Sequence, residues 1–176
     1  QVERFDCDAQ RPTHHFISAN SLINITAVNP DQLNPNYSYG FLAEFLAKHS
    51  AAATDAQALY QRMVFNVLLG NTDEHSRNHA LLYSFNQRTW CLAPAYDVLP
   101  INNSRQHGLG IGASGRFGSV ENLLSHASRF GLKTVKARKL ISQVQDLVSE
   151  WPSYFARLGV GEGDIERLHG IIPRID

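Results

Sequence analysis

The feature that most constrains this chain is a long apolar helix that stops abruptly at a polar loop. Residues 54–69 place apolar side chains on nearly every side of a helical repeat, which is typical of a helix buried in a core. Thr54 and Gln57 have the spacing of a capping box, so we expect the helix to begin at Thr54. Gly70 is a natural stop because glycine readily adopts left-handed backbone angles. The rest of the chain must therefore pack around one central helix.

The other patterns predict a mainly helical α+β domain with one or two small β-hairpins. Two short strands, 79–85 and 89–93, flank a turn at residues 86–88. Segment 10–37 is rich in Pro, Asn, Ser and Asp without a sustained period, so we expect it to be mostly loop. Residues 94–117 are also rich in loop. Apolar residues at helical spacing predict further helices at 38–48, 119–131, 134–150, 152–158 and 163–171.

Length and composition exclude several classes of protein. The 176 residues suit one domain or one lobe, and 43% apolar residues suffice for a core. No apolar run is long enough for a membrane span, so we expect no membrane partner. Two cysteines are too few for a disulfide scaffold, which favours a reducing, cytoplasmic location.

The charge balance is neutral. Sixteen basic residues match sixteen acidic ones, which gives no general attraction to nucleic acid. A local basic face is a possible exception, although a solvated helix surface explains its last segment equally well. Its members are Arg62, Arg77, Arg105, Arg116 and residues 133–139.

The run GNTDEHSRN at 70–78 carries the strongest functional signal. Ordinary turn chemistry explains many such runs. Here, however, Asp73 precedes Asn78 by five residues, and Asp97 follows the hairpin that begins after Asn78. Carboxylate and amide oxygens brought together by a hairpin suit Mg²⁺, and a carboxylate near a hydroxyl orients a nucleophile. This order is that of protein-kinase catalytic machinery, with Asp73 at the hydroxyl and Asn78 and Asp97 at the metal.

Two further motifs in this region are weaker. His75 and His79 have a spacing that binds zinc on helices, but no glutamate lies between them and the segment is predicted as loop. His75 lies two residues after Asp73, so it is either a hydrogen-bond donor to phosphate or a structural histidine. The GIGASG run at 110–115 has the form of a phosphate loop, but its position inside a loop region favours a flexible surface loop.

Four segments together resemble the HipA-like serine/threonine kinases of bacterial toxin–antitoxin systems. MVFNVLLGNTDEHSRNHALL and CLAPAYDVLP look like the family's catalytic and metal segments. VERFD is similar to the hinge between its lobes, and SVENLLSHASRFGL to the helix after its metal loop. The resemblance implies a protein-kinase-like C-terminal lobe, with residues 1–12 as a hinge-like segment and residues 13–176 as a single helical domain.

Carried over position by position, the resemblance also implies roles. Asp73 would be the catalytic aspartate, Asn78 and Asp97 the magnesium ligands, and Glu3 to Phe5 the backbone that borders the adenine of ATP. The implied cofactors are ATP and Mg²⁺, and the implied substrate is a Ser/Thr hydroxyl of a protein. The implied partner is an antitoxin of the DNA-binding helix-turn-helix type, with operator DNA reached only through it.

The resemblance is incomplete before the hinge. Such kinases place a glycine-rich loop and a phosphate-binding lysine there, and this chain starts at the hinge. We therefore expect the chain to be a C-terminal lobe that is inactive alone or nearly so, because charge stabilisation supplies most of the rate. The alternatives are a non-catalytic, pseudokinase-like binding lobe and the lobe of a small-molecule kinase. Retention of Asp73, Asn78 and Asp97 favours chemistry, and substrate trials separate the two kinase classes.

Overall fold

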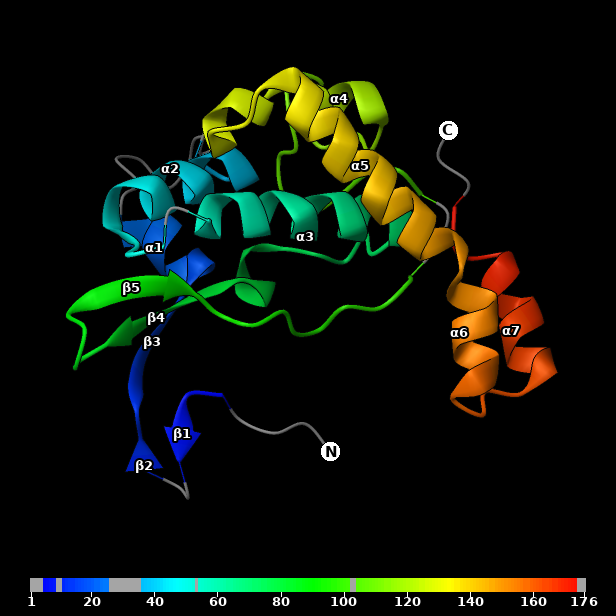
Figure 1. Ribbon diagram of the computed structural model, residues 1–176, viewed down its shortest axis with the longest axis horizontal. Helices are drawn as coiled ribbons and strands as arrows, with labels where there is room; N and C mark the ends of the chain where they lie inside the picture. Colours follow the sequence, from blue (N-terminus) through cyan, green and yellow to red (C-terminus); the bar gives the residue numbers. More distant parts are fainter. Residues whose placement is uncertain (1–4, 9–10, 26–35, 53, 102–103, 174–176) are drawn as a thin grey trace.

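The computed structural model describes residues 5–8, 11–25, 36–52, 54–101 and 104–173. It has the predicted class, a mainly helical α+β domain with small antiparallel sheets (Figure 1). The elements in chain order are β1 Cys7–Asp8, β2 Arg11–Pro12, β3 His14–Ser18, α1 Ala19–Ile25, α2 Tyr39–His49, α3 Asp55–Leu69, the 3-10 turn η1 Ser76–Asn78, β4 Ala80–Ser84, β5 Thr89–Leu92, α4 Val120–Ser125, the 3-10 turn η2 Ala127–Phe130, α5 Thr134–Ser149, α6 Trp151–Arg157 and α7 Glu162–His169.

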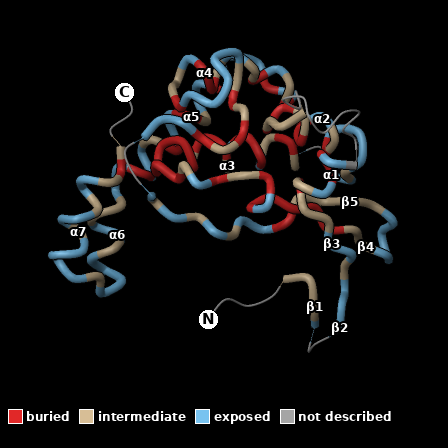
Figure 2. Tube along the Cα trace, turned by 180° about the vertical axis from the view of Figure 1, so that it is seen from behind, coloured by how far each residue is buried: buried red, intermediate tan, exposed pale blue. Residues whose placement is uncertain are grey.

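Helix α3 is the centre of the molecule, as the apolar pattern predicts. Its side chains Leu59, Tyr60 and Met63 are fully buried, and α2, α5 and η2 pack against it. Figure 2 shows the buried residues concentrated along this helix and the elements that cover it. The helix ends at Gly70, whose φ of 76° is left-handed and whose N–H donates to the last turn. The polar loop therefore leaves from a rigid platform.

The start of α3 differs from the prediction. Thr54 has helical backbone angles and its hydroxyl makes no capping hydrogen bond, so the capping box is wrong. Asp55, the first residue of α3, accepts from Ser50 Oγ at 2.6 Å and from the Leu92 N–H at 2.9 Å, so its carboxylate joins α3 to neighbouring segments. Gln57 Oε1 accepts from Lys136 Nζ at 2.7 Å, which ties α3 to α5. The side chains of Asp55 and Gln57 therefore bond to β5 and α5, and the Thr54 side chain does not cap the start of α3.

The prediction of loop across residues 10–37 is wrong for its described first half, which contains β3 and α1. Strand β3 pairs antiparallel with β4, from His14 opposite Ser84 to Ser18 opposite Ala80. The resulting sheet has the order β3-β4-β5. Strand β3 is stabilised by pairing with the distant strand β4, so its own sequence shows no clear alternation of apolar and polar residues. The Ser18 hydroxyl also accepts the Ser21 N–H at 3.1 Å, which helps to start α1.

The hinge-like segment forms a two-stranded ribbon in its described part, with Cys7 opposite Pro12. The GIGASG run forms a tight turn that Asn122 holds by accepting from the Ser114 N–H at 2.8 Å and donating to the Gly115 carbonyl at 3.1 Å. A side chain at Gly112 would collide with the Asn122 carbonyl, so this glycine is required for packing against α4.

The C-terminal helices are predicted to within a few residues, but they are packed differently from α3. Pro152 lies in the first turn of α6, as expected for a residue without a free N–H. Helices α6 and α7 contact each other and project from the body, and neither contains a buried residue (Figure 1). Within the described ranges, no helix has both the length and the apolar character needed to cross a bilayer.

Candidate active site

Asp73 lies in the loop between the end of α3 and η1. Its side chain is exposed and makes no hydrogen bond or ion pair with the described part of the chain. The next residue, Glu74, points the opposite way and is fully buried. The backbone therefore presents one carboxylate outward while its neighbour anchors the loop inward. A free, exposed carboxylate is suited to accepting a hydrogen bond from a substrate hydroxyl.

Asn78 and Asp97 meet, although 18 residues separate them in the chain. Asn78 ends η1 just before β4, and Asp97 follows β5, so the β4–β5 ribbon returns one to the other. Asn78 Nδ2 donates to Asp97 Oδ2 at 3.1 Å. No described residue donates to Asn78 Oδ1 or Asp97 Oδ1. Two hard oxygens are thus left open side by side, which fits Mg²⁺ that completes its shell with phosphate oxygens and water.

The backbone of Asp97 is unusual. Its φ is 55°, in the left-handed region that costs a non-glycine residue free energy. Such a conformation persists where surrounding contacts determine it. Asn71 Nδ2 lies 3.5 Å from the Asp97 carbonyl, and the Ile101 N–H donates to the Gly70 carbonyl at 3.1 Å. The turn at Asp97 aims the carboxylate back toward Asn78.

Two side chains fasten the remainder of the Asp97 loop. Tyr96 Oη donates to the Arg77 carbonyl in η1 at 2.7 Å. Arg62 Nη2 donates to the Ala93 carbonyl at 2.6 Å. Burial lowers the pKa of Arg62, and the nearby hydroxyls of Tyr39 and Tyr96 oppose that change. Arg62 therefore supports the site from inside α3, and its assignment to a basic surface is wrong.

A buried polar layer lies beneath the loop that carries Asp73. Glu74 Oε1 lies 2.7 Å from His79 Nε2, and both residues are buried. Tyr39 Oη accepts from Asn66 Nδ2 at 2.9 Å, and its pKa is well above the ordinary value because of burial first and the charge of Glu74 second. Asn71 Nδ2 donates to Asn66 Oδ1 at 3.2 Å. Sequence patterns did not indicate this layer, although Asn66 inside an apolar helix was a visible signal.

The two histidines of the loop have different surroundings. His79 Nε2 is engaged by Glu74, which removes it from any pairing with His75 around zinc. The described ranges contain no cluster of three or more His, Cys, Asp or Glu that could hold a metal ion. His75 stands at the start of η1, half-buried, and its Nδ1 has no hydrogen-bond partner among the described residues. Its role as a donor to phosphate stays a prediction.

The structure describes only part of the segment that was expected to border adenine. Glu3 lies outside the described residues. Phe5 is half-buried, and its ring centre is 5.9 Å from that of Tyr96. Phe5 also packs against the small cluster of Ala80, Leu82 and Ala93 at the base of the hairpin. The described part of the hinge-like segment therefore lies beside Tyr96, the residue that precedes Asp97.

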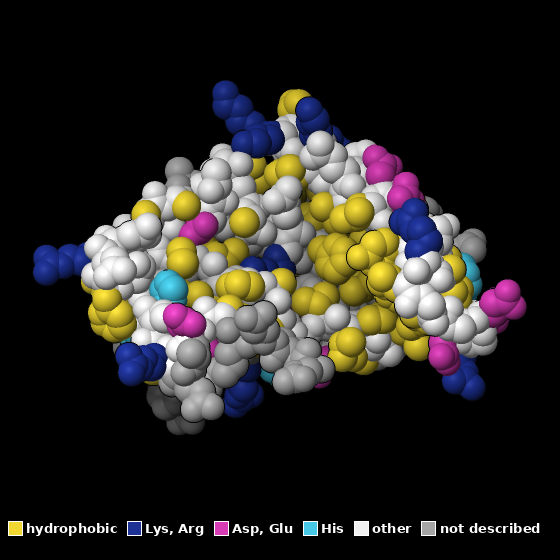
Figure 3. All heavy atoms as spheres, turned by 60° about the horizontal axis from the view of Figure 1, so that its bottom comes forward, with side chains coloured by type: hydrophobic (Ala, Val, Ile, Leu, Met, Phe, Trp, Pro, Cys, Tyr) yellow, Lys and Arg dark blue, Asp and Glu magenta, His cyan; other side chains and the backbone are white. Residues whose placement is uncertain are grey.

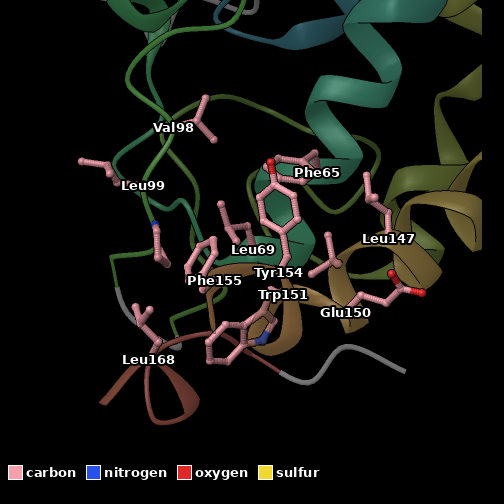
Figure 4. Close-up of a pocket in the computed structure, with 12 residues that line it drawn as sticks. Phe65, Leu69, Val98, Leu99, Leu147, Glu150, Trp151, Tyr154, Phe155 and Leu168 are labelled. Atoms are coloured by element: carbon pink, nitrogen blue, oxygen red, sulfur yellow. The ribbon is translucent and has the colours of Figure 1, made fainter. Parts of the chain in front are cut away.

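An apolar cavity of about 720 Å³ is lined on one side by the residues that follow Asp97 in its loop. Figure 3 shows hydrophobic side chains gathered around a hollow on this face, and Figure 4 shows aromatic rings of α6 pointing into it. Glu150 is its single ionisable lining residue besides Tyr154, and no predicted site residue contributes. The walls of the cavity are Phe65, Leu69, Val98, Leu99, Pro100, Leu147, Val148, Glu150, Trp151, Tyr154, Phe155 and Leu168.

Comparisons with known proteins identify relatives of this chain. A Sinorhizobium fredii protein named "Putative kinase Y4dM" is 31% identical over 98 residues, which are 56% of this chain and 22% of that protein. A Haemophilus influenzae protein named "Putative kinase" is 31% identical over 107 residues, 57% of this chain and 30% of that protein. The chain thus spans less than a third of either relative.

A solved structure shares the fold. It is a chain of the Shewanella oneidensis MR-1 toxin–antitoxin complex of HipA, HipB and its operator DNA, with a TM-score of 0.64 at 18% identity. The match covers 99% of this chain and 43% of that chain. The model of the HipA-like C-terminal domain family matches residues 1–151. The chain therefore belongs to the HipA-like C-terminal domain family.

Proposed function

We propose that this chain is the catalytic C-terminal lobe of a kinase that transfers the γ-phosphoryl group of ATP to a Ser/Thr hydroxyl of a protein. The observation that carries the proposal is the contact of Asn78 with Asp97 at 3.1 Å, with the exposed Asp73 on the same loop as Asn78. The kinase-like family of the relatives agrees with it. The residues then have distinct roles.

Asn78 Oδ1 and the Asp97 carboxylate would hold Mg²⁺, since both are hard oxygen donors left open at one place. Mg²⁺, when bound, neutralises charge on the phosphate oxygens and aligns them. Asp73 accepts the proton of the substrate hydroxyl, which orients that oxygen toward the γ-phosphorus. The bond from this oxygen to phosphorus forms as the β–γ bridging bond breaks, and ADP leaves. His75 would donate a hydrogen bond to the phosphates.

The remaining parts of the kinase would come from outside this chain. Residues 1–12 would be the hinge, with the backbone of Glu3 to Phe5 along the adenine, and residues 13–176 one helical domain. A preceding lobe would supply a glycine-rich loop and a lysine for the phosphates, so this chain alone would have little or no activity. The fold shared with a HipA–HipB–operator complex supports a DNA-binding antitoxin as partner, with DNA reached through it. Such a system would work in the cytoplasm.

The test is phosphoryl transfer by the full-length protein carrying Asp73→Asn or Asp97→Asn. With radiolabelled ATP and Mg²⁺, each variant should label proteins at least about 100-fold more slowly, which is about 2.7 kcal/mol of barrier. Transfer within about tenfold of wild type in either variant would contradict the assigned roles. Labelling of sugars or antibiotics with no protein labelled would instead assign the lobe to a small-molecule kinase.

A further inference from the structure

Two buried ionisable residues frame the loop that carries the proposed site. Glu74 directly follows Asp73, and His79 directly follows Asn78. Both side chains are buried, at 0% and 2% exposure, and Glu74 Oε1 lies 2.7 Å from His79 Nε2. The site residues and the buried pair therefore alternate along one short segment.

The backbone between the two residues is held as tightly as their side chains. The Asn78 N–H donates to the His75 carbonyl at 2.9 Å, which closes the 3-10 turn. The Ala19 N–H donates to the His79 carbonyl at 2.8 Å, which fixes the far end. A side chain at Gly108 would collide with the Glu74 carbonyl, so another segment is pressed against the near end. The Glu74–His79 hydrogen bond closes a loop whose ends are already anchored.

The pair is also continuous with the metal side of the site. The Tyr39 ring lies edge-on to the His79 ring, with centres 5.0 Å apart. From Tyr39, hydrogen bonds lead through Asn66 to Asn71, whose Nδ2 lies 3.5 Å from the Asp97 carbonyl. The charge of Glu74 is felt along this layer, because it raises the pKa of Tyr39 after burial has done so.

Stability alone does not explain such a pair. Glu74 Oε2 and His79 Nδ1 are buried without a hydrogen-bond partner among the described residues. Apolar side chains of similar volume usually stabilise a core as well as a buried ionisable pair does, or better. A buried polar pair does fix geometry, because its hydrogen bond is directional and costly to break.

We propose that the Glu74–His79 hydrogen bond positions the Asp73 carboxylate and the Asn78 carboxamide for phosphoryl transfer. Both are positioning residues: they touch neither metal nor substrate and act through their neighbours. The bond fixes the backbone of the five-residue step, and so fixes the separation of the Asp73 carboxylate and the Asn78 carboxamide. This inference rests on the proposed function and adds two residues to the proposed roles of Asp73, Asn78 and Asp97.

The test uses the full-length protein with Glu74→Ala, which removes the hydrogen bond, and Glu74→Gln, which keeps an acceptor at Oε1. The first readout is the Mg²⁺ concentration for half-maximal binding of a fluorescent ATP analogue. The second is kcat at saturating ATP and Mg²⁺. Glu74→Ala should raise this Mg²⁺ concentration at least fivefold and lower kcat at least tenfold. Glu74→Gln should stay within threefold of wild type for both quantities.

Two further variants separate positioning from folding. Tyr60→Phe removes a buried hydrogen bond to the Leu123 carbonyl on the other side of α3, so it should lower Tm and change neither readout. The double variant E74L/H79F replaces the polar pair by apolar side chains and serves if Glu74→Ala does not fold. It should keep a Tm near that of wild type and still show both losses.

The outcomes are distinguishable. Glu74→Ala or the double variant within threefold of wild type on both readouts would overturn the inference. Glu74→Gln falling as far as Glu74→Ala would overturn the hydrogen bond as the cause. If Asp73→Asn abolishes transfer while the Glu74 variants do not, the inference fails and the proposed function stands. If Asp73→Asn is fully active, the proposed function fails.

Discussion

The two loops that form the candidate site are anchored in different ways. The loop at 70–79 is held by buried side chains, among them Asn71, Glu74 and His79. In the loop at 93–101 only Ala93 is buried, and outside partners grip mainly its backbone. Each loop nevertheless presents one exposed carboxylate. The same kind of functional group is thus carried on two loops that are anchored differently, one by buried side chains and one mainly by its backbone.

The different anchoring of the two loops fits the different roles proposed for their carboxylates. A carboxylate that must orient one hydroxyl gains from a fixed position, because small misplacements of a reacting group cost large factors in rate. A carboxylate that shares an ion with phosphates supplies only part of the shell of Mg²⁺, because water and phosphate oxygens fill the other positions. Substitutions in the first loop that leave a buried polar atom without its partner should cost stability as well as activity. Substitutions in the second should cost mainly activity.

The largest effect should come from Asn78, which belongs to the first loop and touches the second. Asn78→Ala removes the contact to Asp97 and one open oxygen, so phosphoryl transfer by the full-length protein should fall about 100-fold or more, about 2.7 kcal/mol. The rate is measured with radiolabelled ATP. Asn86→Ala, in the exposed turn of the same hairpin, is the control and should be neutral. Equal rates of phosphoryl transfer in the two variants would contradict the role proposed for Asn78.

Tyr39→Phe tests the support of the first loop. The change leaves Asn66 Nδ2 without its buried acceptor, so the free energy of unfolding should fall by about 1–3 kcal/mol. Urea denaturation of the folded protein measures it. Tyr154→Phe, at a half-exposed position in α6, should stay within about 0.5 kcal/mol. An unchanged free energy of unfolding in Tyr39→Phe would mean that the hydrogen bond between Tyr39 and Asn66 does not stabilise the fold.

Tyr96→Phe tests the second loop in the same manner. It removes one hydrogen bond to the Arg77 carbonyl, so the free energy of unfolding should fall by only about 0.5–1.5 kcal/mol. The Mg²⁺ requirement of ATP-analogue binding should nevertheless rise, because Asp97 follows directly and loses a constraint. If Tyr96→Phe destabilises the fold more than Tyr39→Phe does, the contrast between the loops is reversed.

The smallest effect concerns pH. Burial lowers the pKa of His107, and the Glu74 charge and a hydrogen bond with the Asn71 backbone oppose the change only in part. The folded state therefore disfavours the protonated ring, so the unfolded chain binds the proton more readily. The neutral ring's contribution should be full above about pH 6.5 and be lost as the pH falls below that value. His107→Gln should flatten the pH dependence of Tm between pH 7.5 and 5.5, and an unchanged slope would contradict this.

Local chemistry made part of this molecule predictable. The apolar period of α3, its stop at Gly70 and the β4–β5 hairpin are encoded by neighbouring residues, and the hairpin alone implied that Asn78 and Asp97 approach each other. Strand β3 was missed because its order comes from pairing with β4 across some 65 residues. The capping box at Thr54 failed because Thr54 adopts helical backbone angles and the Gln57 side chain accepts from Lys136 in α5 instead.

The support of the site was beyond sequence reasoning for a related reason. Glu74 and His79 look like two more polar residues of a turn, and only the fold shows that they face inward. Arg62 looks like a surface cation in the sequence, and only the structure shows that its guanidinium donates to the Ala93 carbonyl. The left-handed turn at Asp97 has no glycine to announce it. The same residue types occur among the exposed and the buried polar residues of the site. Only the tertiary structure shows which way each side chain points.

The most direct test of the central claim is a crystal structure of the full-length protein with Mn²⁺ and a non-hydrolysable ATP analogue. Anomalous scattering locates the ion without reference to the protein. We expect a peak within about 2.6 Å of both Asn78 Oδ1 and an Asp97 oxygen, with phosphate oxygens completing its shell. An ion bound to the nucleotide but more than about 4 Å from both residues, beyond the coordination range of such cations, would contradict the account.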